Sequence, residues 1–514
     1  LVKKPLEELF KLTKLESIIL GEKLNCNPYE ALVQKYEPLA KVKDIAIVFD
    51  DLKSFLINTL DQIEENQKKD LLIPINQSIS SDTQYSIAKF LKSKNIFISV
   101  YDSEKSIHDL RKELKGINIT NYYAGPLEEK YLNSIDCIAV SPGVDLRNPV
   151  LKSAIKNKIP IINDLTLFSE EINQKKTKVI GVTGTNGKTT VCALLEYLFL
   201  KAGYKAVAAG NIGLPILDIQ NLNEFDIIIL ELSSFQLEVK NQLNFDVGAI
   251  LNITEDHMDR YDTFDHYVRA KYSILEHSKK KIIFADDLVM KEWDVEGAIL
   301  FSDTIQKNKN AYGIKNEKNK RYIVNHSGLK VEITDVNLLG KHNQLNIMAA
   351  VATFKQFDNK FNEIDSAIKK FPVINNRLEW VRKVNGINFY NDSKATNISS
   401  AISAVNAFEG KNIFLIVGGD SKNQDLSLLS RALKSKIKKL YLIGKDAELI
   451  QNACKDLIEV EIKILNTLKE ATHQAFKDAE SGNIVLLAPA CASYDMYKSY
   501  IERGDDFKSI VANF

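Results

Sequence analysis

The sequence predicts an α/β protein with several domains, and two observations carry this prediction. Short apolar runs alternate with helical patterns along nearly the whole chain, which is typical of parallel sheets covered by helices. The chain has 514 residues, too many for one ordinary hydrophobic core, so two to four domains are expected.

The first readable domain covers residues 43–173. Its strand candidates are IAIVF, LLIPI and IFISVY, followed by IDCIAVS (135–141) and IPIIND (159–164), with helical patterns between them. This alternation predicts a nucleotide-binding type of domain. Residues 1–42 precede it and contain a stretch with helical spacing, but no role can be assigned to them.

The polar stretch EINQKKTK predicts a domain boundary near residue 173. A central domain over residues 174–372 then contains the strand candidates VIGVT, FDIIILEL and VGAILNIT. A third domain, residues 373–514, begins after KKFPVINNRLEWV, and its buried strands are expected in NIFLIVGG, KLYLIG and NIVLLAP.

Composition excludes several classes of protein. Lys plus Arg (68) nearly cancels Asp plus Glu (67), and no basic patch or aromatic stacking motif stands out, so no nucleic-acid partner is expected. No apolar run approaches the roughly 18 residues of a membrane span, and no signal-peptide core is visible. The five cysteines are scattered without a CxxC pair. These features predict a cytoplasmic protein with no membrane insertion.

The segment VIGVTGTNGKTT (179–190) has the features of a phosphate-binding loop. An apolar strand enters a loop with Gly184 and Gly187, where backbone N–H groups can approach phosphate oxygens at a helix N-terminus. Lys188 is expected to reach the β- and γ-phosphates, and the Thr189 hydroxyl to bind Mg²⁺. The strict pattern GxxxxGK[ST] is not met, and an ordinary glycine turn before a helix is the alternative.

Two later segments contain candidate metal ligands. Glu231 ends the apolar run FDIIILE, so its carboxylate is expected at the carboxyl edge of a buried strand. His257 follows the next strand in LNITEDHMDRY, and an imidazole can fill one position of an oxygen-rich Mg²⁺ site. A solvent-facing strand end and a structural histidine are the alternatives. Lys271 lies on an amphipathic helical pattern, where a lysine usually occupies a solvated face.

Together these motifs resemble the Mur ligase family. The resemblance spans roughly residues 140–510, and its segments are TGTNGKTT, GNIGLP (210–215), LELSSFQLE (230–238), LNITEDHMDRY (251–261), KHNQLNIMAA (341–350), NRLEWV (376–381), NDSKATN (391–397), GGDSKNQD (418–425) and LAPACASYDMYKSYIERG (487–504). NDSKATN and PACASxD look like the branch of the family that adds D-glutamate. The other branches and the folylpolyglutamate synthetases tend to carry a His- or Asn-containing loop at the NDSKATN position.

The resemblance implies three domains. A Rossmann-like N-terminal domain holds UDP, a P-loop central domain with a mostly parallel sheet holds ATP, and a Rossmann-like C-terminal domain closes with the incoming amino acid. The implied activity is an ATP-dependent amide-bond ligase of peptidoglycan precursor synthesis. It adds D-glutamate to UDP-N-acetylmuramoyl-L-alanine through an acyl phosphate, with two Mg²⁺ ions. We expect a monomer.

The resemblance also implies residue roles. Four residues are expected to be catalytic: Lys188, Glu231, His257 and Lys271. The ATP-binding set is Gly184, Thr185, Asn186, Gly187, Lys188, Thr189, Thr190, Asn346, Arg377 and Asp392. The metal-binding set is Thr189, Glu231, His257 and, if its amine is carbamylated, Lys271. The UDP-substrate set is Asp102, Ser141, Pro142, Gly143 and Asn211. The amino-acid set is Lys394, Thr396, Lys422, Ser493, Tyr494 and Tyr500.

Two departures from the family pattern stand out. The family usually opens its first domain with a Gly-rich strand-to-helix turn, but residues 22–115 contain no Gly and INQSISSDTQYSIAKFL (75–91) stands at that place. A close backbone approach to the diphosphate is therefore not expected there, although Asp102 can still hold the uracil or ribose. Tyr500 replaces the usual Phe near the D-glutamate pocket.

Two alternative functions remain open. The first is another amide ligase of the family, such as the L-alanine-adding step or folate glutamylation. The second is a nucleotide-binding or scaffold protein without catalysis, which the glycine-free first domain favours.

Overall fold

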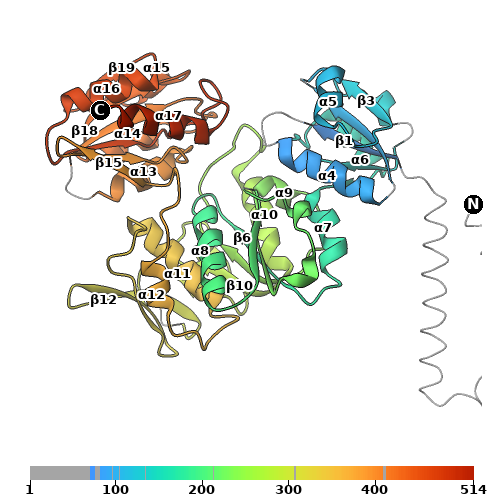
Figure 1. Ribbon diagram of the computed structural model, residues 1–514, viewed down its shortest axis with the longest axis horizontal. Helices are drawn as coiled ribbons and strands as arrows, with labels where there is room; N and C mark the ends of the chain where they lie inside the picture. The colour runs from blue at the N-terminus through green and yellow to red at the C-terminus, as the bar shows by residue number, and fades with distance from the viewer. Residues whose placement is uncertain are drawn as a thin grey trace, which may run out of the picture.

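The computed structural model describes residues 70–75, 81–94, 96–103, 105–132, 135–211, 213–305, 308–408 and 412–514. They form three α/β domains, each with its own sheet. In Figure 1 the N-terminal domain (blue) and the C-terminal domain (orange to red) both lie above the central domain (green to yellow). The N-terminal segment 1–42 and the strand candidate IAIVF lie outside the described residues.

The N-terminal sheet is parallel, with the strand order β3-β2-β1-β4-β5. Its elements are β1 (Asp70–Ile75), α4 (Ser81–Ser93), β2 (Phe97–Asp102), α5 (Ile107–Glu113), β3 (Asn121–Ala124), η2 (Glu129–Leu132), β4 (Cys137–Ala139), α6 (Pro149–Lys156), β5 (Ile161–Ile162) and α7 (Asp164–Ile172). The predicted strands LLIPI, IFISVY, IDCIAVS and IPIIND are confirmed, while β3 was not predicted. The strand order reverses between β1 and β4, and ligands bind at such switch points in open α/β sheets.

The central sheet has the order β14-β13-β12-β11-β10-β9-β6-β8-β7 and is parallel except at β12-β13-β14. Its strands are β6 (Lys178–Thr183), β7 (Ala206–Gly210), β8 (Ile227–Glu231), β9 (Phe245–Ile250), β10 (Ser278–Phe284), β11 (Ile299–Phe301), β12 (Ala311–Glu317), β13 (Lys320–Asn325) and β14 (Lys330–Glu332). The helices are α8 (Lys188–Lys201), η3 (Ile216–Asp218), η4 (Leu222–Glu224), α9 (Ser234–Glu238), α10 (Phe264–Glu276), η5 (Met290–Glu292), α11 (Lys341–Phe354) and α12 (Ile364–Lys369).

Strands β6, β8 and β9 are apolar along nearly their whole length because helices cover both faces of the sheet there. Helices α8 and α11 pack on one face, and α9 and α10 pack on the other. This burial fixes the strands firmly, so the loops at their carboxyl ends are held in place.

The C-terminal sheet has the order β15-β16-β20-β17-β18-β19, antiparallel only at β15-β16. Its elements are β15 (Glu379–Val384), β16 (Ile387–Asn391), α13 (Ile398–Asn406), β17 (Ile413–Gly418), α14 (Ser427–Leu433), β18 (Ile437–Ile443), α15 (Ala447–Ala453), β19 (Glu461–Ile464), α16 (Leu468–Asp478), β20 (Ile484–Leu487) and α17 (Tyr500–Ala512). The three predicted strands of this domain are confirmed as β17, β18 and β20.

The three sheets lie on either side of the two expected boundaries. The first sheet ends at Ile162 and the second begins at Lys178, and the second ends at Glu332 and the third begins at Glu379. The boundaries near residues 173 and 372 stay predictions.

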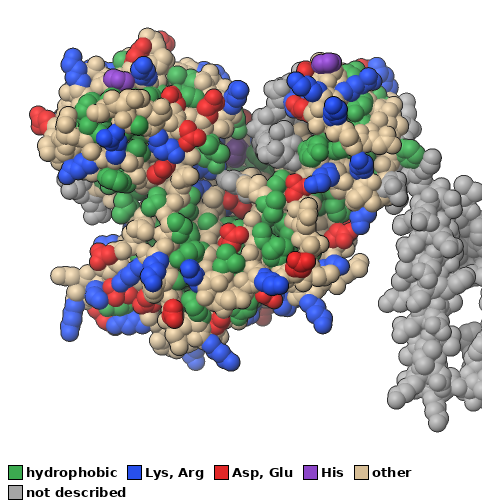
Figure 2. Space-filling model, in the orientation of Figure 1, with side chains coloured by type: hydrophobic (Ala, Val, Ile, Leu, Met, Phe, Trp, Pro, Cys, Tyr) green, Lys and Arg blue, Asp and Glu red, His purple; other side chains and the backbone are tan. Residues whose placement is uncertain are grey.

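On the face shown in Figure 2, acidic and basic side chains are interspersed. None of the described helices combines the length and hydropathy that a membrane span needs.

Candidate active site

Three neighbouring strands of the central sheet, β9, β6 and β8, bring the candidate phosphate and metal residues to one edge. The glycine loop (184–187) follows β6, Glu231 ends β8, and His257 lies in the loop after β9. Because parallel strands present their carboxyl ends at the same edge, these segments meet although they are far apart in sequence.

The glycine loop has the backbone that a phosphate site requires. Gly187 caps α8 with a φ of 86°, and a Cβ at this position would lie 2.3 Å from Oδ1 of Asn346. Only glycine therefore fits here. Nζ of Lys188 donates to the carbonyl oxygens of Gly184 (2.7 Å) and Thr185 (2.9 Å). Burial lowers the pKa of Lys188, although the carboxylates of the site oppose this.

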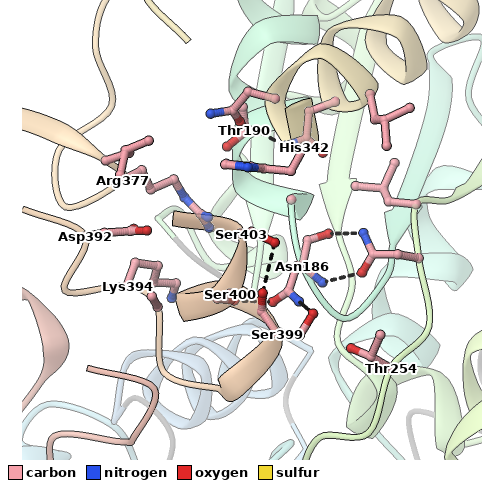
Figure 3. A pocket seen from close by; sticks show the side chains of 18 of the residues that line it. Asn186, Thr190, Thr254, His342, Arg377, Asp392, Lys394, Ser399, Ser400 and Ser403 are labelled. Atoms are coloured by element: carbon pink, nitrogen blue, oxygen red, sulfur yellow. Dashed lines mark hydrogen bonds between the residues drawn. The ribbon is translucent and has the colours of Figure 1, made fainter. Parts of the chain in front are cut away.

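The side-chain amide of Asn252 holds the loop from outside. The backbone N–H of Asn186 donates to Oδ1 of Asn252 (2.8 Å), and Nδ2 of Asn252 donates back to the carbonyl of Asn186 (2.9 Å). Figure 3 shows this reciprocal pair beside Ser399 and Ser400 of the C-terminal domain. The loop is therefore fixed before any ligand arrives.

The candidate metal ligands are compatible with Mg²⁺. The buried hydroxyl of Thr189 has no hydrogen-bond partner within the described part of the chain. Glu231 is only 3% exposed, and its Oε1 accepts from Nδ2 of Asn211 (3.2 Å). Burial lowers the pKa of His257 to about 4, which leaves a neutral imidazole able to bind a cation.

No three His, Cys, Asp or Glu side chains gather as a metal cluster among the residues that the structure describes. Mg²⁺ is usually held by one or two carboxylates together with substrate phosphates. Among the candidate donors Thr189, Glu231 and His257, one is a carboxylate.

Lys271 is buried, so the expectation of a solvated face was wrong. Its side chain is 2% exposed, and Nζ donates to the carbonyl of Gly184 (3.0 Å) and lies 4.7 Å from the centre of the Tyr267 ring. Tyr267, Lys271 and Ile274 share the face of α10 that packs inward. Burial, together with the charge of Lys188, lowers the pKa of Lys271 well below its ordinary value.

A cavity of about 610 Å³, here called the junction cavity, is lined by all three domains. It brings together residues from the predicted ATP-binding, metal-binding, UDP-substrate and amino-acid sets. These residues are Thr185, Lys188, Asn211, His257, Lys271, Lys394, Thr396, Lys422, Ser493, Tyr494 and Tyr500. The N-terminal domain contributes Gln84, Lys105 and Glu113, none of which was predicted. Nζ of Lys394 lies 3.9 Å from the centre of the Tyr500 ring, so the Phe-to-Tyr departure keeps an aromatic face for this cation.

A second pocket of about 200 Å³ lies between the glycine loop and the C-terminal domain. Its lining includes the predicted ATP-binding residues Asn186, Gly187, Thr190, Asn346, Arg377 and Asp392, together with Lys394 of the predicted amino-acid set. In Figure 3 the side chains of Arg377, Asp392 and Lys394 approach from the C-terminal domain. Burial raises the pKa of Asp392 to about 7 against the attraction of Arg377, and burial with Arg377 lowers that of Lys394 to about 7.

The predicted UDP-substrate residues lie mainly at the carboxyl edge of the N-terminal sheet. Asp102 ends β2, and its Oδ1 accepts from the backbone N–H of Lys105 (2.9 Å). Ser141, Pro142 and Gly143 follow β4. Nε2 of Gln84, from α4, donates to Oγ of Ser141 (3.3 Å) across the switch point between β1 and β4. Of the UDP set, only Asn211 lines the junction cavity.

Asp256 links the central and C-terminal domains, and it was not predicted as a site residue. Its carboxylate accepts from Nζ of Lys422 (2.8 Å) and from Nδ2 of Asn397 (3.0 Å). Burial alone would raise the pKa of Asp256, but His257, Lys422 and Asn397 together hold it far below its ordinary value. Both Asp256 and Asn397 belong to motifs that the sequence singled out, so their place in those motifs was the available signal.

Arg503 was also missed, although it lies in the last motif. Its guanidinium is almost fully buried and donates to Oγ (3.0 Å) and the carbonyl (2.9 Å) of Ser393, and to the carbonyls of Cys491 (3.2 Å) and Gly418 (3.4 Å). These acceptors lie on the loops that follow β16 and β20 and at the end of β17. Arg503 therefore joins the three loops that carry the predicted amino-acid residues.

The class of protein follows from this geometry together with comparison to known families. Three family models match in order: the Mur ligase MurD-like N-terminal domain over residues 81–163, the Mur ligase middle domain over 182–354, and the Mur ligase glutamate ligase domain over 376–491. The chain belongs to the Mur ligase family.

The relatives are more specific. A UDP-N-acetylmuramoylalanine–D-glutamate ligase of Methylobacillus flagellatus is 34% identical over 437 residues, which cover 84% of this chain and 95% of the relative. A solved UDP-N-acetylmuramate–alanine ligase of Thermotoga maritima shares the fold, with a TM-score of 0.55 and 17% identity over 87% of this chain and all of that one. A MurF ligase of the same organism, solved in complex with ADP, has a TM-score of 0.54 and 16% identity over 81% of this chain and 95% of that one.

A fourth family model, the carboxypeptidase Taq (M32) metallopeptidase, matches residues 1–97. Most of this stretch lies outside the described residues, and it overlaps the MurD-like match at residues 81–97. The first histidine of the chain is His108, so the matched stretch cannot supply the paired histidines of an HExxH zinc site. The match nevertheless covers the place where the Gly-rich turn is missing.

Proposed function

We propose that this protein is the ATP-dependent ligase that adds D-glutamate to UDP-N-acetylmuramoyl-L-alanine in peptidoglycan precursor synthesis. The single observation that carries the proposal is the junction cavity, which gathers the phosphate-loop lysine, the metal-site histidine and the amino-acid residues of the D-glutamate-type motifs. The similarity to D-glutamate ligases over 84% of the chain supports the same substrates.

The reaction must first activate a carboxylate, which is a poor electrophile. The γ-phosphoryl group of ATP passes to the carboxylate of the L-alanyl substrate, and the resulting acyl phosphate is attacked by the amino nitrogen of D-glutamate. An amide bond forms and inorganic phosphate leaves. Lys188, at the N-terminus of α8, stabilises the charge on the transferring phosphoryl group, as preorganised cations do in phosphoryl transfer.

The second pocket, between the glycine loop and the C-terminal domain, supports a role for the remaining ATP-binding residues. Asn186, Gly187, Thr190 and Asn346 surround the nucleotide from the central domain, while Arg377 and Asp392 approach it from the C-terminal domain. ATP thereby links the two domains, and domain closure excludes the water that would hydrolyse an acyl phosphate.

Thr189, Glu231 and His257 would hold Mg²⁺, and two ions are proposed. Bound Mg²⁺ would neutralise phosphate charge and polarise the phosphoryl oxygens. The unpartnered hydroxyl of Thr189 and the neutral imidazole of His257 support this assignment.

Lys271 is proposed to act as a carbamate. Its buried amine has a strongly lowered pKa, so the neutral form that attacks CO₂ is populated. The nitrogen of the neutral amine forms a bond to the CO₂ carbon and loses one proton, which leaves an anion beside Lys188. That anion would offset the positive charge of the site.

Lys394, Thr396, Lys422, Ser493, Tyr494 and Tyr500 are proposed to bind D-glutamate, and Asn211 to contact the muramoyl-alanine. Asp102 and the loop 141–143 are proposed to hold the UDP portion at the switch point of the N-terminal sheet. We also propose that the protein is cytoplasmic, in line with its scattered cysteines, and a monomer, because all three domains that line the junction cavity belong to one chain.

The test is phosphate release from ATP by the purified full chain with UDP-N-acetylmuramoyl-L-alanine and, in turn, D-glutamate, L-glutamate or L-alanine. We expect release that requires both the UDP-substrate and D-glutamate. Release with L-alanine and UDP-N-acetylmuramate would assign another step of the family. Folded protein that binds ATP and releases no phosphate with any acceptor would support a non-catalytic role instead.

A further inference from the structure

Arg260 connects two loops of different domains, and the chemistry described above does not use it. Its Nη1 donates to the carbonyl of Gly143 (2.7 Å) and its Nη2 to the carbonyl of Val144 (3.0 Å). Both acceptors lie on the loop after β4 of the N-terminal domain, next to Ser141. Arg260 itself lies in the loop after β9, and its backbone N–H donates to the carbonyl of His257 (2.9 Å).

An aromatic ring completes the connection on the central-domain side. The guanidinium carbon of Arg260 lies 4.6 Å from the centre of the Phe235 ring, and the centres of the Phe235 and His257 rings are 4.9 Å apart in an edge-type contact. Phe235 belongs to α9, directly after the strand that ends in Glu231. The orientation of Arg260 is thus coupled to His257, one of the candidate metal ligands.

A second arginine, Arg147, also connects the loop after β4 with the loop after β9, through a different carbonyl. Arg147 pairs with Asp145 through two nitrogens and donates from Nη2 to the carbonyl of Asp259 (2.7 Å). The loops 141–147 and 257–261 are therefore tied together in both directions, each by an arginine that donates to carbonyls of the other.

We propose that Arg260 is a positioning residue that holds the nucleotide-binding loop 141–144 at a fixed distance from His257, so that the UDP end and the reacting carboxylate of one substrate are kept in register. The inference rests on the proposed function, since it needs a substrate that spans both loops. Arginine suits this place because separate nitrogens of its planar fork donate to two successive carbonyls while its flat face stacks on a ring, whereas lysine offers a single ammonium nitrogen and no planar face.

The test compares Arg260→Lys with Arg269→Lys in the full chain. Arg269 is a matched control because its exposed side chain lies on α10 and pairs only with Asp265 within the described residues. For Arg260→Lys we expect the KM for the UDP-substrate to rise about tenfold, the usual cost of one lost charge-assisted hydrogen bond, with the KM values for ATP and D-glutamate unchanged. Binding of UDP alone, measured by titration calorimetry, should weaken by a similar factor.

A purely structural role would lower kcat through loss of folded enzyme and leave all three KM values alone, and that result would overturn the proposal. UDP binding by Arg260→Lys equal to that of the unmodified chain would also overturn it. Phe235→Leu is the second variant, in case Arg260→Lys does not fold. It keeps both carbonyl contacts and removes the ring beside His257, so we expect unchanged UDP binding with a lower kcat, and weakened UDP binding would contradict the proposal.

These outcomes separate the two proposals. An unmodified chain that binds UDP but needs no D-glutamate for phosphate release contradicts the proposed function, and the UDP titration still decides the role of Arg260. An unmodified chain that is active while Arg260→Lys behaves like Arg269→Lys contradicts only the positioning role.

Discussion

Nζ of Lys422 donates a 2.8 Å hydrogen bond to Oδ1 of Asp256 and so joins the loop after β17 to the loop after β9. The Lys422 side chain is 15% exposed and that of Asp256 is 9% exposed, so water screens this ion pair little. Around it stand Lys188 and Lys394, both of which line the same cavity. Asp256 therefore balances positive charge that would otherwise separate the two domains.

Replacing Asp256 by Asn should open this junction. The change keeps the shape of the side chain but leaves Lys422 as a poorly solvated cation without its counter-ion, which typically costs about 3 kcal/mol or more. We expect kcat/KM for D-glutamate to fall at least about tenfold and the radius of gyration from small-angle X-ray scattering to increase. Glu255→Gln, at the exposed neighbouring position, is the control. An unchanged radius with full activity would show that Asp256 does not hold the domains together.

Replacing Lys188 by Ala should abolish product formation. The side chain already lies against the glycine-loop carbonyls, so its loss removes a cation at the transferring phosphoryl group, and such cations contribute several kcal/mol. We expect phosphate release to fall at least about a thousandfold. Lys201→Ala, at the exposed C-terminal end of the same helix, should behave like the unmodified chain. Retained activity in Lys188→Ala would remove the phosphate-site assignment.

Lys271→Ala should be weakly active and should respond to small carboxylates. The cavity left by the buried side chain lies beside the carbonyl of Gly184, and a short carboxylate such as acetate can place an anion where the carbamate would lie. We expect added acetate to restore part of the activity of the variant and bicarbonate to restore none. If neither acetate nor bicarbonate changes the activity of the variant, and circular dichroism shows that it folds normally, the result would argue that Lys271 acts as a cation.

The parts of the site that could be predicted from sequence are those whose chemistry lies within one short segment. The glycine loop with Lys188 and Thr189 is such a segment, and Glu231 could be placed because an apolar run ends there. The role of Asp256 could not be predicted from the sequence, because its partners Asn397 and Lys422 lie 141 and 166 positions away. Nothing local distinguishes a carboxylate that bridges two domains from one in solvent.

Lys271 shows the same limit in a helix. The spacing of apolar residues around Lys271 predicts an amphipathic helix. Whether the lysine lies on the buried or the solvated face depends on what packs against it, and here that is the carbonyl of Gly184, 87 positions earlier. The N-terminal domain was less readable because the glycine signal of its binding turn is missing. There the contact between Gln84 and Ser141 is visible only in three dimensions.

The pKa of Lys394, lowered to about 7 by burial and by Arg377, predicts a pH-dependent affinity for D-glutamate. Above about pH 7 the free enzyme loses the ammonium form, and an anionic ligand needs that form, so its KM should rise by up to about tenfold per pH unit. Binding at about pH 8 should also take up a proton, measurable by calorimetry in buffers of different ionisation enthalpy. Lys394→Met should bind weakly with no such pH dependence. A KM that is flat from about pH 6.5 to 9 would contradict the assignment.

Asp164 predicts a pH dependence of stability rather than activity. It opens α7, is 2% exposed, and its Oδ2 accepts from Nε2 of Gln236 in α9 (2.7 Å). Burial raises its pKa from 3.8 to about 6, although the hydrogen bond from Gln236 opposes the rise. The folded chain therefore binds the proton more tightly than the unfolded chain. The resulting stabilisation is complete below pH 3.8 and is lost as pH rises through about 6.

Asp164→Asn should remove this loss because an amide cannot ionise. Each unit of pKa is worth about 1.4 kcal/mol, so the variant should exceed the unmodified chain by up to about 3 kcal/mol in free energy of unfolding near pH 7.5. Near pH 4 the carboxyl group is already protonated in the folded chain. The free energies of unfolding of the variant and the unmodified chain should then differ only by the effect of the amide on the contact with Gln236. The measurement is urea unfolding at both pH values. A difference between variant and unmodified chain that does not grow with pH would show that Asp164 ionises without penalty where α7 meets α9.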